Sequence, residues 1–479
     1  MSKSTRPAPK ISQAMIAWLP FADAASTELP LSQLLRLSLF QFSVGMAAVL
    51  LNGTLNRVMI VELSVPAWMV ATLIAVPLLV APFRALIGHK SDRHVSALGW
   101  RRVPYIWFGT LMQFGGLAIM PFALLLLSRE ADFMLGTIGA AGAFLLTGAG
   151  FHITQTAGLA LATDLAPEDK RPRAVALLYV MLLVGMMFSA FVIGGLLIEF
   201  SPTRLVQVIQ GAAVVTFILN LTALWKQEAR APERNKANDD APSFRELWNA
   251  FVKDGRNARL LTAIGIGAAG FAMQDALLEP YGGEVLGLSV GATTALTGAW
   301  ALGALVGFIL SGRSLSRGAD PLRIAGMGLV TGVAAFLLIL FAAPFGSPMM
   351  LFAGASFIGL GLGLFSVGTL IEAMNLAKQA TAGLALGAWG AVQATCAGLG
   401  IFLGGALRDI VAWMAADGSL SEVLATRATG YGTVYILEIL LLLAGLAAIG
   451  PLVGHARRTT TDPTGETGQP FGGLREFPT

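Results

Sequence analysis

Residues 88–107, GHKSDRHVSALGWRRVPYIW, decide the fold, because they form a polar turn between two long apolar runs. The turn holds four Lys or Arg, two His and one Asp. Each flanking run is long enough to cross a bilayer as a helix. Positive charge gathered in such a short loop is typical of the cytoplasmic side of a membrane protein.

The composition is that of a protein with many membrane spans. Of the 479 residues, 55% are hydrophobic and 13% are charged, and the mean hydropathy is +0.71. About a dozen apolar runs in series exclude a soluble core. The net charge of +4 comes from the loops, so it indicates topology and not nucleic-acid binding. The single cysteine, Cys396, excludes a disulfide framework and a Cys-ligated metal site.

The apolar runs predict an all-α polytopic membrane protein with twelve transmembrane helices in two six-helix halves. The predicted spans are 34–56, 66–88, 104–127, 135–162, 174–199, 204–225, 260–279, 290–311, 322–344, 348–371, 382–406 and 432–453. The polar stretches divide the chain into five predicted parts. These are a cytoplasmic N-terminal segment (1–33), a first half (34–225), a cytoplasmic linker (226–259), a second half (260–454) and a disordered cytoplasmic tail (455–479).

The distribution of positive charge predicts the orientation. If the N-terminus is inside, nearly all of the 32 Lys and Arg fall on the inner side. The exceptions are Arg57, Arg129, Arg204, Arg408 and Arg427 in outer loops and Arg84 within a span. Since Lys and Arg gather in cytoplasmic loops, both termini and the central linker are expected in the cytoplasm.

A weak internal repeat supports the division into halves. Gly88 and Arg93 are separated from Gly312 and Arg317 by the same number of positions. A second constant spacing relates four residues of the first half to four of the second: Gly148, Gly150, Asp164 and Ala166 to Gly359, Gly361, Asn375 and Ala377. Parallel repeats of six helices are a transporter architecture.

Several motifs carry a family resemblance. Gly88, Asp92 and Arg93 resemble the Gly-rich Asp-Arg motif between the second and third helices of the major facilitator superfamily. Four longer blocks are more specific: 53–63 GTLNRVMIVEL, 96–107 SALGWRRVPYIW, 155–164 QTAGLALATD and 274–286 QDALLEPYGGEVL. On these blocks the chain resembles the bacteriochlorophyll delivery family of that superfamily, which includes the PucC and LhaA proteins of purple bacteria.

The resemblance implies an assembly factor for photosynthetic light-harvesting complexes, with the LhaA type and the core antenna (light-harvesting 1) favoured. Such a protein would deliver bacteriochlorophyll or hold antenna polypeptides during pigment insertion. The implied cofactors are bacteriochlorophyll and carotenoid. The implied partners are membrane lipids, light-harvesting antenna polypeptides, the reaction centre with its core antenna, and pigment-synthesis enzymes. The implied location is the bacterial inner, intracytoplasmic photosynthetic membrane.

His152 is the candidate bacteriochlorophyll ligand, because it lies inside the fourth span and a neutral imidazole can ligate magnesium. Gln155 follows it by about one turn. Trp300 and Trp389 lie in the spans and could line an apolar pigment groove. The alternative for His152 is a helix-packing role, with a hydrogen bond to a neighbouring helix.

Gln274, Asp275 and Glu279 form a candidate polar cluster in the seventh span. A regular helix would place Asp275 and Glu279 on one face, where they could bind a cation, relay protons or engage a partner. Because Pro280 follows, Glu279 is expected at the water interface. Asp275 is expected to be the one acid deep enough to need a partner, with a structural or docking role favoured. Glu438 is an acid of the twelfth span that the pattern does not explain.

A cytoplasmic clamp is expected where charged side chains join the inner helix ends by hydrogen bonds. Its candidate residues are Gly88, Asp92, Arg93, Arg101, Arg102 and Arg317. A second cytoplasmic cluster is expected around Asp164 and residues 170–173. This chemistry is structural or gating and not catalytic.

Two functions stay open on the sequence. One is the assembly factor implied by the resemblance. The alternative is a proton-coupled secondary transporter of a small solute or amphiphile, which draws on the facilitator-like architecture and on Asp275 and Glu279. An enzyme is disfavoured, because the sequence has no Walker A motif and no supported Ser-His-Asp arrangement.

Overall fold

The computed structural model describes residues 30–79, 100, 102–129, 132–167, 170–228, 255–376, 382–418, 421 and 426–453. Within these residues every regular element is a helix. Among the described residues, eleven helices are long and apolar enough to cross a membrane. α3 (Ala67–Leu79) is a shorter apolar helix at the place of the second predicted span. The predicted class, an all-α polytopic membrane protein of two six-helix halves, is confirmed.

The helices follow the predicted spans. In the first half they are α2 (Leu31–Ala48), η2 (Val49–Leu55), η3 (Val58–Glu62), α3, α5 (Val103–Leu127), α6 (Phe133–Leu165), α7 (Arg171–Leu196) and α8 (Pro202–Leu224). In the second half they are α10 (Gly255–Ala272), η7 (Met273–Ala276), α11 (Leu278–Glu284), α12 (Val290–Ser316), α13 (Pro321–Ala342), α14 (Pro348–Leu376), α15 (Ala382–Ala416), α16 (Arg427–Ile449) and η8 (Gly450–Leu452).

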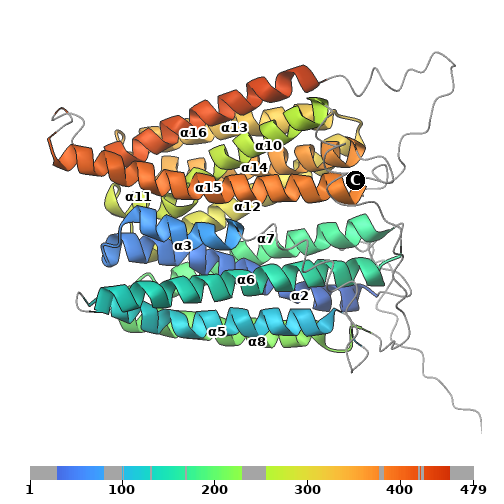
Figure 1. The fold of residues 1–479 in the computed structure, drawn as a ribbon, viewed down its shortest axis with the longest axis horizontal. Helices are drawn as coiled ribbons and strands as arrows, with labels where there is room; N and C mark the ends of the chain where they lie inside the picture. The colour runs from blue at the N-terminus through green and yellow to red at the C-terminus, as the bar shows by residue number, and fades with distance from the viewer. Residues whose placement is uncertain are drawn as a thin grey trace, which may run out of the picture.

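Figure 1 shows the two halves side by side, with the first half (blue to green) below and the second (yellow-green to red) above. α2 begins and α16 finishes at the same end of the bundle, on the right of the view. Following the predicted orientation, we call this end the inner end and the opposite one the outer end. The orientation itself stays a prediction.

Several predicted features lie outside the described residues. They are Gly88, Asp92, Arg93 and Arg101 of the clamp, most of segment 1–33, most of linker 226–259, and the tail 455–479. The predicted domain limits therefore stay a prediction.

Local sequence fixes several helix starts. Ser201 and Ser289 accept hydrogen bonds from the backbone N–H groups of Arg204 and Ala292, both at 3.2 Å, at the first turns of α8 and α12. Asp320 does the same for Leu322 at 2.8 Å, at the start of α13. Small polar side chains are preferred at this position because they satisfy N–H groups that lack a partner within the helix.

The glycines of the internal repeat occupy equivalent packing positions. A Cβ on Gly150 of α6 would lie 2.5 Å from the Gln113 nitrogen of α5, and one on Gly361 of α14 would lie 2.7 Å from the Gly328 oxygen of α13. Each glycine thus lets its helix approach the preceding one closely. Gly148 faces α3, and its counterpart Gly359 faces α12. The repeat predicted from spacing is therefore a repeat of helix contacts.

Helices at the boundary join the two halves. α3 packs against α15, and α7 packs against α12. Close approach at the outer end again depends on small residues: a Cβ on Gly291 of α12 would lie 2.4 Å from the Gly194 oxygen of α7, and one on Gly405 of α15 would lie 2.5 Å from the Ala71 Cβ of α3. The halves are thus in tight contact at their outer ends.

Replacing Gly303 by valine is expected to lower stability strongly. A Cβ at this position of α12 would lie 1.9 Å from the Ser356 oxygen of α14, so the two helices must move apart. Overpacking of this kind costs about 2–3 kcal/mol. Thermal unfolding in mild detergent measures the effect. The matched control is Gly312→Val on the same helix, where a Cβ meets nothing within 4 Å; an equal loss in both variants would contradict the packing argument.

Candidate functional site

The first and seventh spans are irregular at the boundary between the halves. In the first span, α2 is followed by two π-helical segments, η2 and η3. In the seventh span, the 3₁₀ segment η7 separates α10 from α11. The two spans occupy equivalent places in the two halves. Irregular turns within membrane helices free backbone groups and often mark functional sites.

Asn56 connects these two irregular spans. Its Nδ2 donates to Glu279 Oε2 at 2.9 Å and to the Asp275 backbone oxygen at 3.2 Å. The other carboxylate oxygen of Glu279 accepts from Thr297 Oγ1 of α12 at 2.8 Å. Asn56, Glu279 and Thr297 are all buried. One carboxyl group therefore holds together residues from three spans and both halves.

Gln274 and Glu438 extend the cluster into the twelfth span. The Gln274 backbone N–H donates to Glu438 Oε1 at 2.7 Å, and its side-chain Nε2 donates to Asp275 Oδ1 and, at 3.3 Å, to the Phe271 oxygen. Glu438 is fully buried and Asp275 is partly exposed. The structure thus explains the place of Glu438, which contacts the break in the seventh span.

The prediction that Glu279 reaches the water interface is wrong. Glu279 is 4% exposed, and Asp275 is more exposed than Glu279. The helix does not end at Pro280, because η7 interrupts it earlier and Pro280 falls in the first turn of α11. Proline is tolerated there, since the first-turn N–H groups have no partner within the helix. Because η7 interrupts the helix, Asp275 and Glu279 do not share one face of a regular helix.

A network of charged residues lies at the outer end. Arg408 Nη2 contacts Glu284 Oε2 at 2.6 Å, and its Nη1 contacts Asp409 Oδ1 at 2.8 Å. The Tyr431 hydroxyl donates to Glu284 at 2.9 Å, and the Arg408 guanidinium lies 4.9 Å from the centre of the Tyr431 ring. Asp409 also accepts from the Trp68 backbone N–H at 2.8 Å, which joins the second half to the first.

A cavity of about 480 Å3 lies beside this network, with Glu284, Arg408 and Arg427 in its lining. Across the boundary, the buried Arg57 pairs with Glu62 at 2.5 Å and donates to the Leu288 oxygen at 3.2 Å. Asn56, Arg57 and Trp68 thus bond across the boundary between the halves at the polar cluster or nearer to the outer end.

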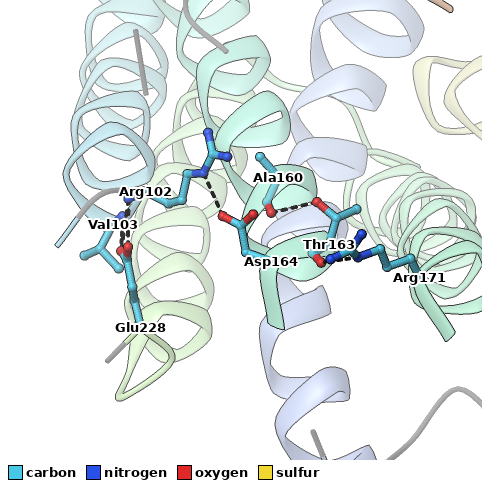
Figure 2. A network of polar contacts seen from close by, with 7 residues as sticks. All are labelled: Arg102, Val103, Ala160, Thr163, Asp164, Arg171 and Glu228. Atoms are coloured by element: carbon cyan, nitrogen blue, oxygen red, sulfur yellow. Dashed lines mark hydrogen bonds and ion pairs between the residues drawn. The ribbon is translucent and has the colours of Figure 1, made fainter. Parts of the chain in front are cut away.

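Arg102 joins three elements at the inner end (Figure 2). Its Nε donates to Asp164 Oδ2 at 3.0 Å, from α5 to α6. Glu228, which follows α8, accepts from the backbone N–H groups of Arg102 and Val103 at 2.9 to 3.2 Å. A carboxylate at a helix N-terminus satisfies unpaired N–H groups and the helix dipole. Arg171 Nε donates to the Thr163 oxygen at 3.0 Å.

The structure thus brings Arg102 and the predicted Asp164 cluster together. Arg317, at the end of α12, is exposed, and its backbone N–H donates to the Ser314 oxygen at 3.2 Å. An ion pair that the sequence did not predict lies at the inner end of the second half, where Nη2 of the partly exposed Arg256 contacts Oε1 of the buried Glu372 at 2.8 Å. The sequence does show both Arg256 and Glu372 as charged residues near the inner ends of their spans, and this position could have indicated the pair.

Replacing Arg102 by glutamine is expected to destabilise the inner end of the first half. Arg102 is 5% exposed, so the substitution removes a buried guanidinium from its ion pair with Asp164. Hydrogen bonds to charged groups contribute about 1.5–3 kcal/mol. Thermal unfolding is the measurement, and Arg171→Gln is the control, because Arg171 is exposed. Equal unfolding midpoints for wild type and Arg102→Gln would refute this role.

His152 and Gln155 are buried side chains of α6. Both ring nitrogens of His152 are buried, and its ring centre lies 4.3 Å from that of Phe151. Gln155 Nε2 donates to Gln41 Oε1 of α2 at 3.2 Å. Trp389 Nε1 of α15 donates to Thr369 Oγ1 of α14 at 3.1 Å, and Trp300 packs against the main apolar core. Of these four predicted pigment contacts, Gln155 and Trp389 thus bond to a neighbouring helix of their own half, His152 is buried, and Trp300 packs against the main apolar core.

Comparison with known proteins gives relatives that match along nearly the whole chain. A model of the family described as PUCC protein matches residues 54–457. Protein PucC of Rhodovulum sulfidophilum is 58% identical over 82% of this chain and 88% of its own length. A protein of Rhodobacter capsulatus, described as an uncharacterized protein in the puhA-bchM intergenic region, is 55% identical over 97% of this chain and 98% of its own.

More distant similarities concern the fold or a weaker relationship. The bacteriochlorophyll synthase 44.5 kDa chain of Rhodobacter capsulatus is 28% identical over 91% of this chain and 99% of its own. A bacterial homologue of the human lysosomal transporter Spinster superposes with a TM-score of 0.66 at 15% identity, over 87% of this chain and 95% of that structure. The chain therefore has the transporter fold of the major facilitator superfamily.

Proposed function

The chain belongs to the PUCC protein family, and from this membership we propose that it is an assembly factor for photosynthetic light-harvesting complexes. Its client would be the core antenna, light-harvesting 1. It would deliver bacteriochlorophyll or hold antenna polypeptides during pigment insertion, with no catalytic role. It would do so in the bacterial inner photosynthetic membrane, with both termini in the cytoplasm.

The observation that carries this proposal is the extent of the family match. Residues 54–457 include the blocks 96–107, 155–164 and 274–286, which lie in both halves. Three of these blocks supply contacts that organise the molecule: Arg102 at the inner end, Gln155 inside the first half, and Glu279 between the halves. The match therefore covers the residues that hold the fold together.

His152 does not fit the role of a pigment ligand in this conformation. An axial ligand must present a ring nitrogen to a space that accepts a flat macrocycle, and both nitrogens of His152 are buried. The helix-packing alternative agrees better with this burial. We therefore assign bacteriochlorophyll and carotenoid to no particular side chain, and propose that any pigment is held elsewhere on the molecule or together with the antenna polypeptide.

Purification in mild detergent tests this proposal. We expect bacteriochlorophyll absorption, light-harvesting polypeptides, or both, to accompany the wild-type protein. His152→Leu should retain the same pigment per chain, since its ring is packed inside α6. A protein that is free of pigment and of antenna polypeptides under all mild conditions would contradict the proposal, and loss of pigment in His152→Leu alone would restore the ligand role.

A second candidate is a proton-coupled secondary transporter of a small solute or amphiphile. It is favoured by one observation, the buried Glu279 and the partly exposed Asp275 at the boundary between halves that would have to separate. Uptake into proteoliposomes under a proton gradient would support it. Candidate amphiphiles that stay outside under every imposed gradient would exclude it.

A further inference from the structure

We propose that Asp275 and Glu438 together bind one exchangeable proton at the break in the seventh span. This inference adds Glu438, which neither candidate function uses, to Asp275, which the transporter candidate already uses. It rests on the placement of three carboxyl groups within the membrane and does not depend on what the protein carries or assembles.

The first step is the absence of a compensating positive charge. Asp275 lies within electrostatic reach of both Glu279 and Glu438, and Gln274 contacts both Asp275 and Glu438. Among the described ion pairs, Arg57 pairs with Glu62 and Arg408 pairs with Glu284 and Asp409. Within the described chain no Lys or Arg pairs with the three acids. A carboxylate buried at membrane depth without a partner charge is very costly, so the cluster must carry protons or another cation.

The second step separates Glu279 from the other two acids. Glu279 accepts a hydrogen bond on each oxygen, from Asn56 and from Thr297. Donors on both oxygens stabilise the ionised form of a carboxyl group. Glu438 instead accepts one bond on Oε1, and its buried Oε2 has no partner among the described residues. Glu438 is therefore the group best suited to hold the proton.

The third step is an independent polar group beside Glu438. The Tyr435 hydroxyl, one turn earlier on α16, is fully buried and has no hydrogen-bond partner in the described part of the chain. It lies within electrostatic reach of Glu438 and Glu279. Glu438 Oε2 and the Tyr435 hydroxyl are thus two buried oxygens on neighbouring positions of α16 that lack hydrogen-bond partners among the described residues. A proton on Glu438 removes the uncompensated charge at this place.

The fourth step is a path for exchange. Asp275 is the partly exposed member of the cluster, and the Gln274 side chain contacts its carboxylate. A proton taken up by Asp275 can move to Glu438, and leaves by the reverse route. The titratable groups that interact with the pair are Glu279 of α11, which is near Asp275, and Tyr435 of α16, which is near Glu438. Tyr281 of α11 packs against both Tyr435 and Tyr431 of α16.

Infrared spectroscopy of the purified protein in lipid nanodiscs tests the assignment. Protonated carboxyl groups give a separate C=O band, whose intensity is followed as the pH is raised. We expect wild type to lose the band of about one buried carboxylic acid per chain. Glu438→Gln should lack that band, and Asp275→Asn should shift or slow its titration. Glu199→Gln, at an exposed acid, should titrate as wild type does.

Two further arms keep the outcome decisive. Tyr435→Phe retains every carboxyl group, so we expect the same total intensity of the carboxylic acid band with its titration shifted in pH. This variant tests the assignment even if Glu438→Gln folds poorly. The titration is repeated in sodium chloride and in choline chloride, and the proton assignment predicts the same curve in both. An unchanged carboxylic band in folded Glu438→Gln would overturn the proposal. A band that disappears only when Na+ is added would show that the site binds sodium, and this outcome would also overturn the proposal.

Discussion

Glu279→Leu is expected to give the least stable of the single variants considered for the cluster. The leucine side chain has a similar size but accepts no hydrogen bond, so the Thr297 hydroxyl loses its acceptor and the Asn56 amide keeps only its longer bond to the Asp275 backbone oxygen. Since each unsatisfied buried polar group costs about 1–3 kcal/mol, a total loss of about 2–4 kcal/mol is expected. The measurement is the free energy of unfolding in mixed micelles, with Glu199→Leu as the exposed control.

A double-mutant cycle separates this contact from a general loss of packing. If Asn56 and Glu279 act on one another, the double variant Asn56→Leu/Glu279→Leu loses less stability than the two single variants summed. The reason is that the Asn56 amide is no longer present as a donor that has lost its Glu279 acceptor. Strict additivity would show that Asn56 does not join the halves through Glu279.

Arg408→Met is expected to destabilise the outer end by a similar amount. The substitution removes the cation from Glu284 and Asp409 and the contact with the Tyr431 ring. The side chains of Arg408 and Glu284 are 17% and 15% exposed, so solvent only partly replaces the lost partner. Breaking a largely buried ion pair costs about 3–5 kcal/mol at full burial, and about 2–4 kcal/mol is expected here.

Arg427→Met is the matched control for this prediction. Arg427 lines the same cavity but is exposed at the start of α16, so its replacement is expected to change the unfolding midpoint little. Thermal unfolding compares the two variants under one set of conditions. Equal midpoints for Arg408→Met and Arg427→Met would contradict the importance of the Glu284 network.

The sequence predicted the fold because each span contains its own signal. The long apolar runs correspond to helices throughout the described chain, and the spacing of Gly148 and Gly150 from Gly359 and Gly361 corresponds to equivalent helix contacts. Small residues are needed wherever two membrane helices approach closely. Close helix contacts that occur at equivalent places in both halves can therefore be predicted from the spacing of the glycines.

The site was predicted only in part, because it depends on contacts between distant spans. The sequence indicated Asp275 and Glu279, but the partners Asn56 and Thr297 are ordinary polar residues of other helices. Pro280 suggested a helix end, whereas the break lies earlier, at η7. Conversely, the membrane position of His152 suggested a ligand, and the structure buries both of its nitrogens. Burial of this kind follows from tertiary packing and not from local pattern.

The near-infrared absorption of a deletion strain tests the proposed assembly role most directly. Membranes of the source bacterium lacking this chain are compared with wild type and with the strain carrying the restored gene, at equal reaction-centre content. We predict that the core-antenna absorption per reaction centre falls several-fold in the deletion strain and returns on complementation. Core-antenna absorption that stays at the wild-type level without the chain would contradict the account.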